Sequence, residues 1–267
     1  MAILFSLILC LSCDLPAMSP LPVQAAPVDV ELVLAVDVSR SMDREEFALQ
    51  RAGYVAALRD PDFMGAVRAG VNGRIALTYF EWAGTVREET VVPWQIIDSA
   101  ETAADFAARL ESRPFDTFRG TSISGALTFG SGLFDDNAVD GFRRVIDVSG
   151  DGPNNIGTPV IAARDAAVSA GITVNGLPIL IRPSPTFAEL DRYYAECVTG
   201  GAGSFVLPIR QASEFSTAIR RKLILEVSGI GDGAPLIRAQ AGIPVDCLKG
   251  ERDRRLYSDP YFPELDR

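Results

Sequence analysis

The sequence of 267 residues contains no histidine, and positive charge is scarce beside negative charge. A serine hydrolase without histidine has no ordinary base to activate its nucleophile. The 25 lysine and arginine residues face 35 aspartate and glutamate residues, which gives a formal net charge of −10. A nucleic acid or an anionic membrane would have to bind against the field of the protein, so we exclude both as partners.

Long apolar runs are also missing, apart from a short one near the N-terminus. It extends from Ala2 to Ser12 and is too short to span a bilayer, while the segment Val23 to Ala25 suits signal cleavage. We therefore predict a signal peptide over residues 1–26, and a periplasmic or secreted mature protein with no membrane span. The weak n-region leaves a misassigned start codon as an alternative, and a lipoprotein signal ending at Cys13 is another.

Only four cysteines are present, and signal removal would leave Cys197 and Cys247. In an oxidising compartment an even pair is most simply a disulfide, which would attach the C-terminal tail to the body of the domain. The alternative is two unrelated buried thiols.

Apolar periodicity predicts alternating strands and helices between residues 27 and 228. Several strands are nearly continuous apolar runs, which is typical of a parallel sheet covered on both faces, so we predict an α/β domain. The segment 85–97, TVREETVVPWQII, is predicted as one antiparallel edge strand, where Pro93 is tolerated. Residues 229–267 show no period and are predicted to be a partly ordered extension. The predicted strands are 30–36, 74–82, 143–148, 171–181 and 204–207, and the predicted helices are 44–58, 102–112, 122–133, 159–169, 186–197 and 213–225.

Oxygen-bearing side chains follow the first predicted strand in the segment DVSRS, as Asp37, Ser39 and Ser41. Ligands of open parallel sheets bind beyond the carboxyl ends of strands, and one carboxylate with two hydroxyls is a ligand set for a hard cation. Three ligands do not complete the shell. Thr121 in FRGTSISGAL and Asp151 in VIDVSGDGPNN are the candidates for the remaining oxygens.

With these segments in this order, the chain resembles the von Willebrand factor A (VWA) domain family over residues 28–228. That family carries D-x-S-x-S, a later Thr and a later Asp-Gly as its metal-ion-dependent adhesion site (MIDAS). More closely, the chain is similar to a bacterial exported VWA-like subfamily with no assigned function, DUF1194-like. The resemblance implies a Rossmann-like sandwich whose central sheet has helices on both faces.

The resemblance also implies how the site would work. The hydroxyls of Ser39, Ser41 and Thr121 would contact Mg²⁺, or Mn²⁺ or Ca²⁺ in its place, while Asp37 and Asp151 would act directly or through water. A partner protein would supply a Glu or Asp to the open coordination position, so the resemblance implies a binding module and no enzyme.

Other interpretations compete for these residues. Asp43 and Glu46 form the pattern of a helix capping box, and Ser39 and Ser41 could serve as helix caps. Asp147, inside a predicted strand, is a weaker alternative to Asp151. We expect Trp82 and Trp94 to pack in the interior or to lie at the rim of a surface that binds a partner.

Other functions fit the sequence less well. An Asp-nucleophile phosphohydrolase needs a second acid two residues after Asp37, where Ser39 stands. The segment GTSISG lacks the G-x-S-x-G spacing of serine hydrolases, and no G-x-G-x-x-G follows the first strand for a dinucleotide. A structural envelope protein without metal function is the remaining alternative.

Overall fold

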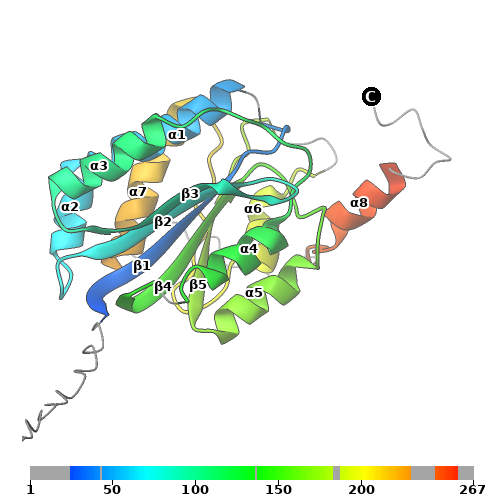
Figure 1. The fold of residues 1–267 in the computed structure, drawn as a ribbon. Helices are drawn as coiled ribbons and strands as arrows, with labels where there is room; N and C mark the ends of the chain where they lie inside the picture. The colour runs from blue at the N-terminus through cyan, green and yellow to red at the C-terminus, as the bar shows by residue number, and fades with distance from the viewer. Residues whose placement is uncertain (1–24, 43, 136, 183–186, 230–243, 258–267) are drawn as a thin grey trace, which may run out of the picture.

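The computed structural model describes residues 25–42, 44–135, 137–182, 187–229 and 244–257 (Figure 1). Nearly all of the predicted signal peptide lies outside these residues, and so does Asp43. The first strand begins at Ala26, one residue before the predicted start of the domain.

A five-stranded sheet forms the centre of the molecule, with the strand order β3-β2-β1-β4-β5 (Figure 1). β1 pairs in parallel with β2 and β4, and β4 pairs in parallel with β5. Only β3, which contains Pro93, is antiparallel to its neighbour. This confirms the predicted mostly parallel sheet with one antiparallel edge strand. The strands are β1 (Ala26–Asp37), β2 (Ile75–Trp82), β3 (Val86–Ile97), β4 (Val139–Gly150) and β5 (Ile172–Pro178).

Helices cover both faces of the sheet, as predicted. In the centre of β1, Leu32 and Leu34 pack into the core on one face, while Val33 and Ala35 pack into the core on the other. Both side-chain rows are buried, which explains the continuous apolar run. The first face holds α1 (Arg44–Leu58), α2 (Pro61–Arg68), α3 (Ala100–Glu111) and α7 (Phe215–Ser228); the second holds α4 (Ile123–Gly132), α5 (Val160–Ser169) and α6 (Leu190–Tyr193).

Two predicted elements differ in the structure. The segment 204–207 is no regular strand and meets β5 in one isolated parallel bridge, Gly176 with Val206, and a second isolated bridge follows just beyond it, Ile179 with Ile209. Pro208 lies between these bridges and has no N–H to extend the ladder. Among the described residues of the helix predicted over 186–197, only α6 is α-helical, and the chain continues as a π-helical turn, Tyr194–Val198.

The sequence prediction missed α2, although Asp60 accepts a hydrogen bond from the N–H of Asp62 at 2.8 Å as its N-cap and Pro61 opens the helix. A short 3₁₀ turn, Ala212–Glu214, precedes α7.

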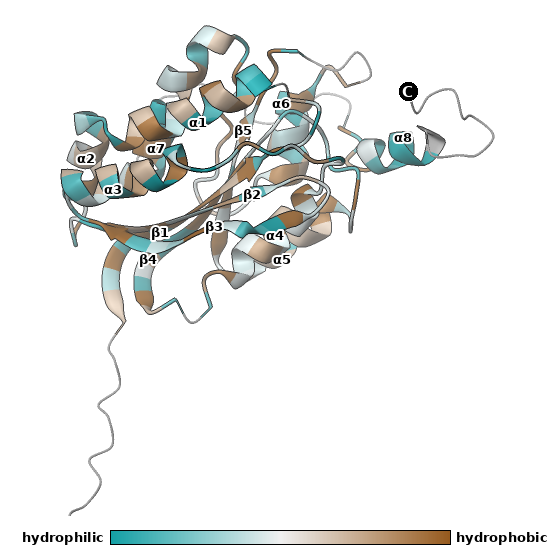
Figure 2. Ribbon diagram, turned by 45° about the horizontal axis from the view of Figure 1, so that its top comes forward, coloured by the Kyte–Doolittle hydropathy of each residue, from teal (hydrophilic) through white to brown (hydrophobic). Residues whose placement is uncertain are grey.

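The C-terminal extension contains a helix, α8 (Lys249–Tyr257), which Figure 2 shows to be largely hydrophilic. The predicted disulfide between Cys197 and Cys247 is present, with the two Cα atoms 5.6 Å apart. It joins the π-helical turn to the segment before α8. Within the described parts of the chain, no helix has the length and apolar character to cross a membrane.

Candidate metal centre

Asp37 ends β1 in a fully buried position at the carboxyl edge of the sheet. Its Oδ1 accepts a hydrogen bond of 2.6 Å from the backbone N–H of Ser39. Its Oδ2 has no hydrogen-bond partner among the described residues. A Cβ atom on Gly150 would lie only 2.8 Å from this oxygen, so the missing side chain leaves room beside it.

A chain of hydrogen bonds connects the loop after β1 with the loop after β4. The hydroxyls of Ser39 and Ser41 are 2.9 Å apart, and the Ser41 hydroxyl donates to Asp151 Oδ1 at 2.6 Å. Since β1 and β4 are neighbouring parallel strands, their carboxyl ends lie together. The structure thus brings Asp37, Ser39, Ser41 and Asp151 to one place.

Thr121 lies on a third loop beside them. Residues 118–121, here called the Thr121 loop, run next to the loop after β1, since Ser39 and Phe118 form a parallel bridge and Arg40 N–H donates to Phe118 C=O at 2.9 Å. The Thr121 hydroxyl oxygen lies 3.9 Å from the position of a Cβ on Gly152. Thr121 is buried, and no hydrogen bond between described residues joins its hydroxyl to the other four side chains.

Both carboxyls of the cluster are hard to ionise. Burial, followed by the charge of Asp151, raises the pKa of Asp37 well above its usual range. Burial also raises the pKa of Asp151 to about 6, with a contribution from the Glu46 charge and against the hydrogen bond from Ser41. The buried carboxylate of Asp37 and the half-buried carboxylate of Asp151 repel each other, and a divalent cation between them would remove that penalty.

The donor set suits such a cation. An unpaired buried carboxylate oxygen, a second carboxylate and three hydroxyls are hard oxygen ligands, with no nitrogen or sulfur to select a softer metal. No group of three or more His, Cys, Asp or Glu side chains gathers at a point in the described ranges. A site here therefore depends on hydroxyl ligands and bound water as well as on the two carboxylates.

The sequence did not predict that Glu46, Arg182 and Tyr194 lie near the cluster. Glu46 is buried and accepts a hydrogen bond of 3.1 Å from Arg182 Nε, with a second, shorter contact to the same guanidinium. Tyr194, on the π-helical turn, has a buried hydroxyl without a partner among the described residues, 2.8 Å from where a Cβ on Gly150 would lie. No sequence signal identifies Arg182 or Tyr194, because their proximity depends on how distant segments pack.

Asp147 lies away from the cluster. It is fully buried in β4, and its Oδ1 is 2.9 Å from the ammonium of Lys222 on α7. Successive side chains of a strand point to opposite faces, and Asp147 points to the α7 face. The tryptophans are packing residues: Trp82 is fully buried, and the indole N–H of Trp94 donates to Leu133 C=O at 2.8 Å.

The family model described as "Protein of unknown function (DUF1194)" matches residues 27–231. A comparison with curated proteins found no match.

Several solved structures are similar in fold. They include proximal thread matrix protein 1 from the mussel byssus with a zinc-occupied MIDAS motif (18% identity, TM-score 0.56, covering 76% of this chain and 49% of that one). A von Willebrand factor type A protein from Catenulispora acidiphila is also similar (18% identity, TM-score 0.53, 76% and 43%). A third is the pilus adhesin SpaC from Lactobacillus rhamnosus GG (15% identity, TM-score 0.55, 76% and 30%). The match spans about half or less of each of these proteins, and at these identities it shows a shared fold.

Proposed function

Because the chain belongs to the DUF1194 family and has the VWA fold, we propose that it is an exported protein-binding module that holds a divalent cation at the carboxyl edge of its sheet. The cation would capture an acidic side chain of a partner protein. In this proposal the residues that hold it are Asp37, Ser39, Ser41, Thr121 and Asp151, and Mg²⁺ is the expected ion.

One observation carries the proposal: Asp37 Oδ2 is buried without a hydrogen-bond partner in the described chain, beside the linked Ser39, Ser41 and Asp151 side chains. An unpaired buried carboxylate oxygen is costly, and such atoms in native structures call for an explanation. A bound cation supplies one.

The protein groups have distinct roles in this arrangement. The hydroxyls of Ser39, Ser41 and Thr121 would contribute neutral oxygens, and the two carboxylates would supply the balancing charge. When bound, the cation would act as a Lewis acid with an open position for a carboxylate oxygen.

The surroundings favour an acidic partner. Arg40 lies between the two serines and Arg119 lies on the Thr121 loop; both are exposed, and neither forms a side-chain hydrogen bond or ion pair with another described residue. Both arginines are within two residues of a proposed ligand in the sequence, on a protein whose formal net charge is −10. Positive charge at the rim of a site attracts acidic ligands and speeds their association.

The test measures binding of a short peptide with a single glutamate, in Mg²⁺ and in EDTA. We expect binding in Mg²⁺, loss of binding in EDTA, and loss of binding after Asp37→Ala. Equal binding under the two conditions would overturn the metal mechanism. If the protein is instead an envelope component without metal function, its melting curves with and without Mg²⁺ will coincide, whereas a ligand of the native state raises the melting temperature.

A further inference from the structure

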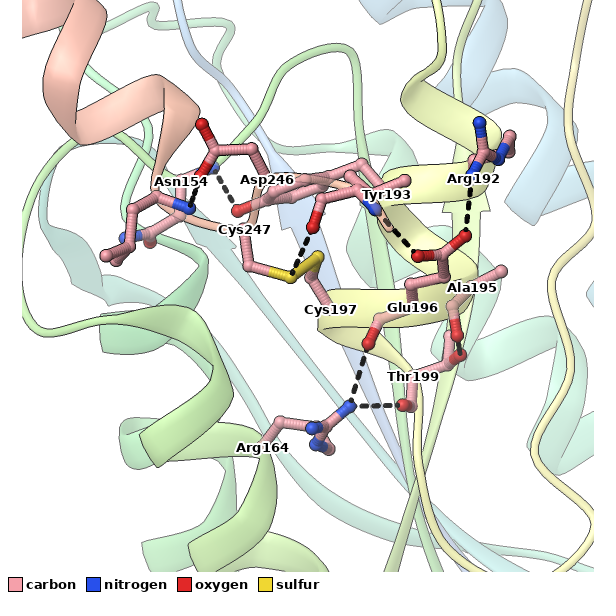
Figure 3. Close-up of a disulfide and its surroundings, with 12 residues drawn as sticks. Asn154, Arg164, Arg192, Tyr193, Ala195, Glu196, Cys197, Thr199, Asp246 and Cys247 are labelled. Atoms are coloured by element: carbon pink, nitrogen blue, oxygen red, sulfur yellow. Dashed lines mark hydrogen bonds and ion pairs between the residues drawn. A yellow bond between two sulfur atoms is a disulfide. The ribbon is translucent and has the colours of Figure 1, made fainter. Parts of the chain in front are cut away.

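The C-terminal segment 244–257 meets the two loops that carry Thr121 and Asp151. The disulfide joins Cys247 to Cys197, which is buried on the π-helical turn (Figure 3). Next to the bond, Val245 N–H donates to Glu196 Oε2 at 2.9 Å. Asp246 lies in the turn before α8, and its side chain accepts from Leu248 N–H at 3.1 Å. The bond and these contacts attach α8 to the sheet domain.

α8 approaches the loop after Asp151 closely. A Cβ on Gly250 would lie 2.2 Å from the C=O oxygen of Asn154, so only glycine permits this approach. Glu251 Oε1 accepts a hydrogen bond of 2.8 Å from the side-chain amide of Asn154. Asn154 is fully buried, and its Oδ1 accepts from Ser124 N–H, in the first turn of α4, at 2.9 Å.

The next residue of the loop, Asn155, holds Thr121 directly. Asn155 Oδ1 accepts from Thr121 N–H at 2.9 Å, and Asn155 N–H donates to Thr121 C=O at 2.8 Å. The same Oδ1 also accepts from Arg254 of α8 at 3.3 Å. The guanidinium of Arg254 also lies close to Gly120, where an added Cβ would be 3.1 Å from its Nη1. Gly120 has a φ of +85° and no side chain, so the Thr121 loop can approach the guanidinium.

From these contacts we infer that α8 positions Thr121 for the cation, so that the affinity of the site for a divalent metal depends on the disulfide and on Glu251 and Arg254. The inference rests on the proposed function. Glu251, Arg254, Asn154 and Asn155 are positioning residues, since they act on the site through the backbone of the Thr121 loop. Groups that orient metal ligands affect affinity strongly when they are lost, by about 10- to 100-fold.

The experiment uses the full chain and the metal alone. Two variants break the connection at different points: Cys197→Ser with Cys247→Ser, and Glu251→Ala with Arg254→Ala. Lys249→Ala is the matched control, because Lys249 lies on the same helix and pairs within it, with Asp253 at 3.0 Å. Glu251→Gln is the conservative variant, since its side-chain oxygen can still accept from Asn154.

Mn²⁺ affinity and amide hydrogen exchange over residues 118–124 are the two readouts. We expect both double variants to bind Mn²⁺ about tenfold more weakly than the unaltered chain. Exchange over the Thr121 loop is expected to be faster in these variants even without metal. The Lys249→Ala and Glu251→Gln proteins should match the unaltered chain in both measurements.

The outcomes separate this inference from the proposed function. Unchanged Mn²⁺ affinity, or unchanged exchange, in a folded Glu251→Ala, Arg254→Ala protein overturns the role of α8. Absence of Mn²⁺ binding in the unaltered chain overturns the proposed function instead, and the exchange measurement then still decides whether α8 holds the Thr121 loop.

Discussion

The hydroxyl of Ser41 donates a hydrogen bond of 2.6 Å to Oδ1 of Asp151, although 110 positions separate the two residues in the sequence. The contact joins the loops that follow β1 and β4, which are adjacent parallel strands. It is the link that turns the segment DVSRS and a distant Asp-Gly into one cluster.

Asp37→Asn separates the metal role of Asp37 from its structural role. Asparagine keeps the shape and the acceptor for Ser39 N–H but removes a buried charge that has one unpaired oxygen. We expect a melting temperature without metal equal to or above that of the unaltered chain, and loss of the Mg²⁺-induced increase. At a Mg²⁺ concentration of 100 times Kd, the lost stabilisation is about 2.7 kcal/mol. Calorimetry with and without Mg²⁺ measures it, and Asp116→Asn, at an exposed acid, is the control.

Gly150→Ala should block the proposed site by filling the space beside Asp37 Oδ2. The added Cβ would lie 2.8 Å from that oxygen and 2.8 Å from the Tyr194 hydroxyl, so both must shift. We expect a stability loss of about 1–3 kcal/mol, as for an overpacked position, and weaker Mn²⁺ binding. Gly152→Ala is the control, because its Cβ would meet Thr121 Oγ1 at an ordinary 3.9 Å. Equal Mn²⁺ titrations for the two variants would contradict the position of the site.

Arg40→Glu and Arg119→Glu should slow the association of an acidic peptide. Both residues are exposed beside the proposed site, and exposed charges act mainly on the association rate and on its salt dependence. In Mg²⁺ at low ionic strength, stopped-flow binding of the glutamate peptide should be several-fold slower, with a shallower dependence on salt. Arg68→Glu, on α2 at the opposite end of the molecule from α8 in Figure 1, should leave the rate unchanged. A slowing of equal size there would show that only net charge matters.

Glu226→Gln should stabilise the protein at alkaline pH. Glu226 is fully buried on α7; its Oε1 is 2.6 Å from Lys222, which also pairs with Asp147, so two carboxylates share one ammonium. Burial, followed by the charge of Asp147, raises the pKa of Glu226 from 4.5 to about 7. The native state therefore holds this proton more tightly than the unfolded chain does. Its contribution to stability is complete below pH 4.5 and is lost as the pH rises through 7.

Denaturant unfolding at pH 5 and pH 8 checks this expectation. The gain from Glu226→Gln should be small at pH 5 and on the order of 3–4 kcal/mol at pH 8, at about 1.4 kcal/mol per pKa unit. Glu88→Gln, at an exposed position on β3, is the control and should show no such difference. A gain that is larger at pH 5 would contradict the assigned direction of the pKa change.

Much of the fold was predictable because the apolar pattern of each strand reflects its surroundings. β1 is apolar on both faces and is covered by helices on both faces, whereas β3 alternates and lies at the edge. The segment 204–207 has a similar apolar character, but Pro208 and the turns before it limit it to one isolated bridge. The local apolar pattern therefore predicts burial reliably. It predicts less reliably whether a buried segment forms a regular strand of the sheet.

The candidate site was predictable in part for a related reason. Asp37 and Asp151 follow buried strands, and the carboxyl ends of parallel strands meet at one edge, so their proximity follows from the strand assignment alone. No such rule predicts the partners of Glu46 and Asn155. These partners, Arg182 and Arg254, lie more than ninety positions away in the sequence. Their contacts depend on tertiary packing, which the local sequence pattern does not predict.

The sequence by itself determined the α/β class, the parallel sheet, and the oxygen-bearing side chains available at the edge of the sheet. The reason is that the residue types of each segment set both its burial pattern and its side-chain chemistry. Only the tertiary structure decided that one buried oxygen of Asp37 has no hydrogen-bond partner in the part of the chain that is described, that Lys222 is shared by two carboxylates, and that α8 reaches the Thr121 loop. These features depend on distances between side chains from separate elements, and such distances exist only once the chain has packed.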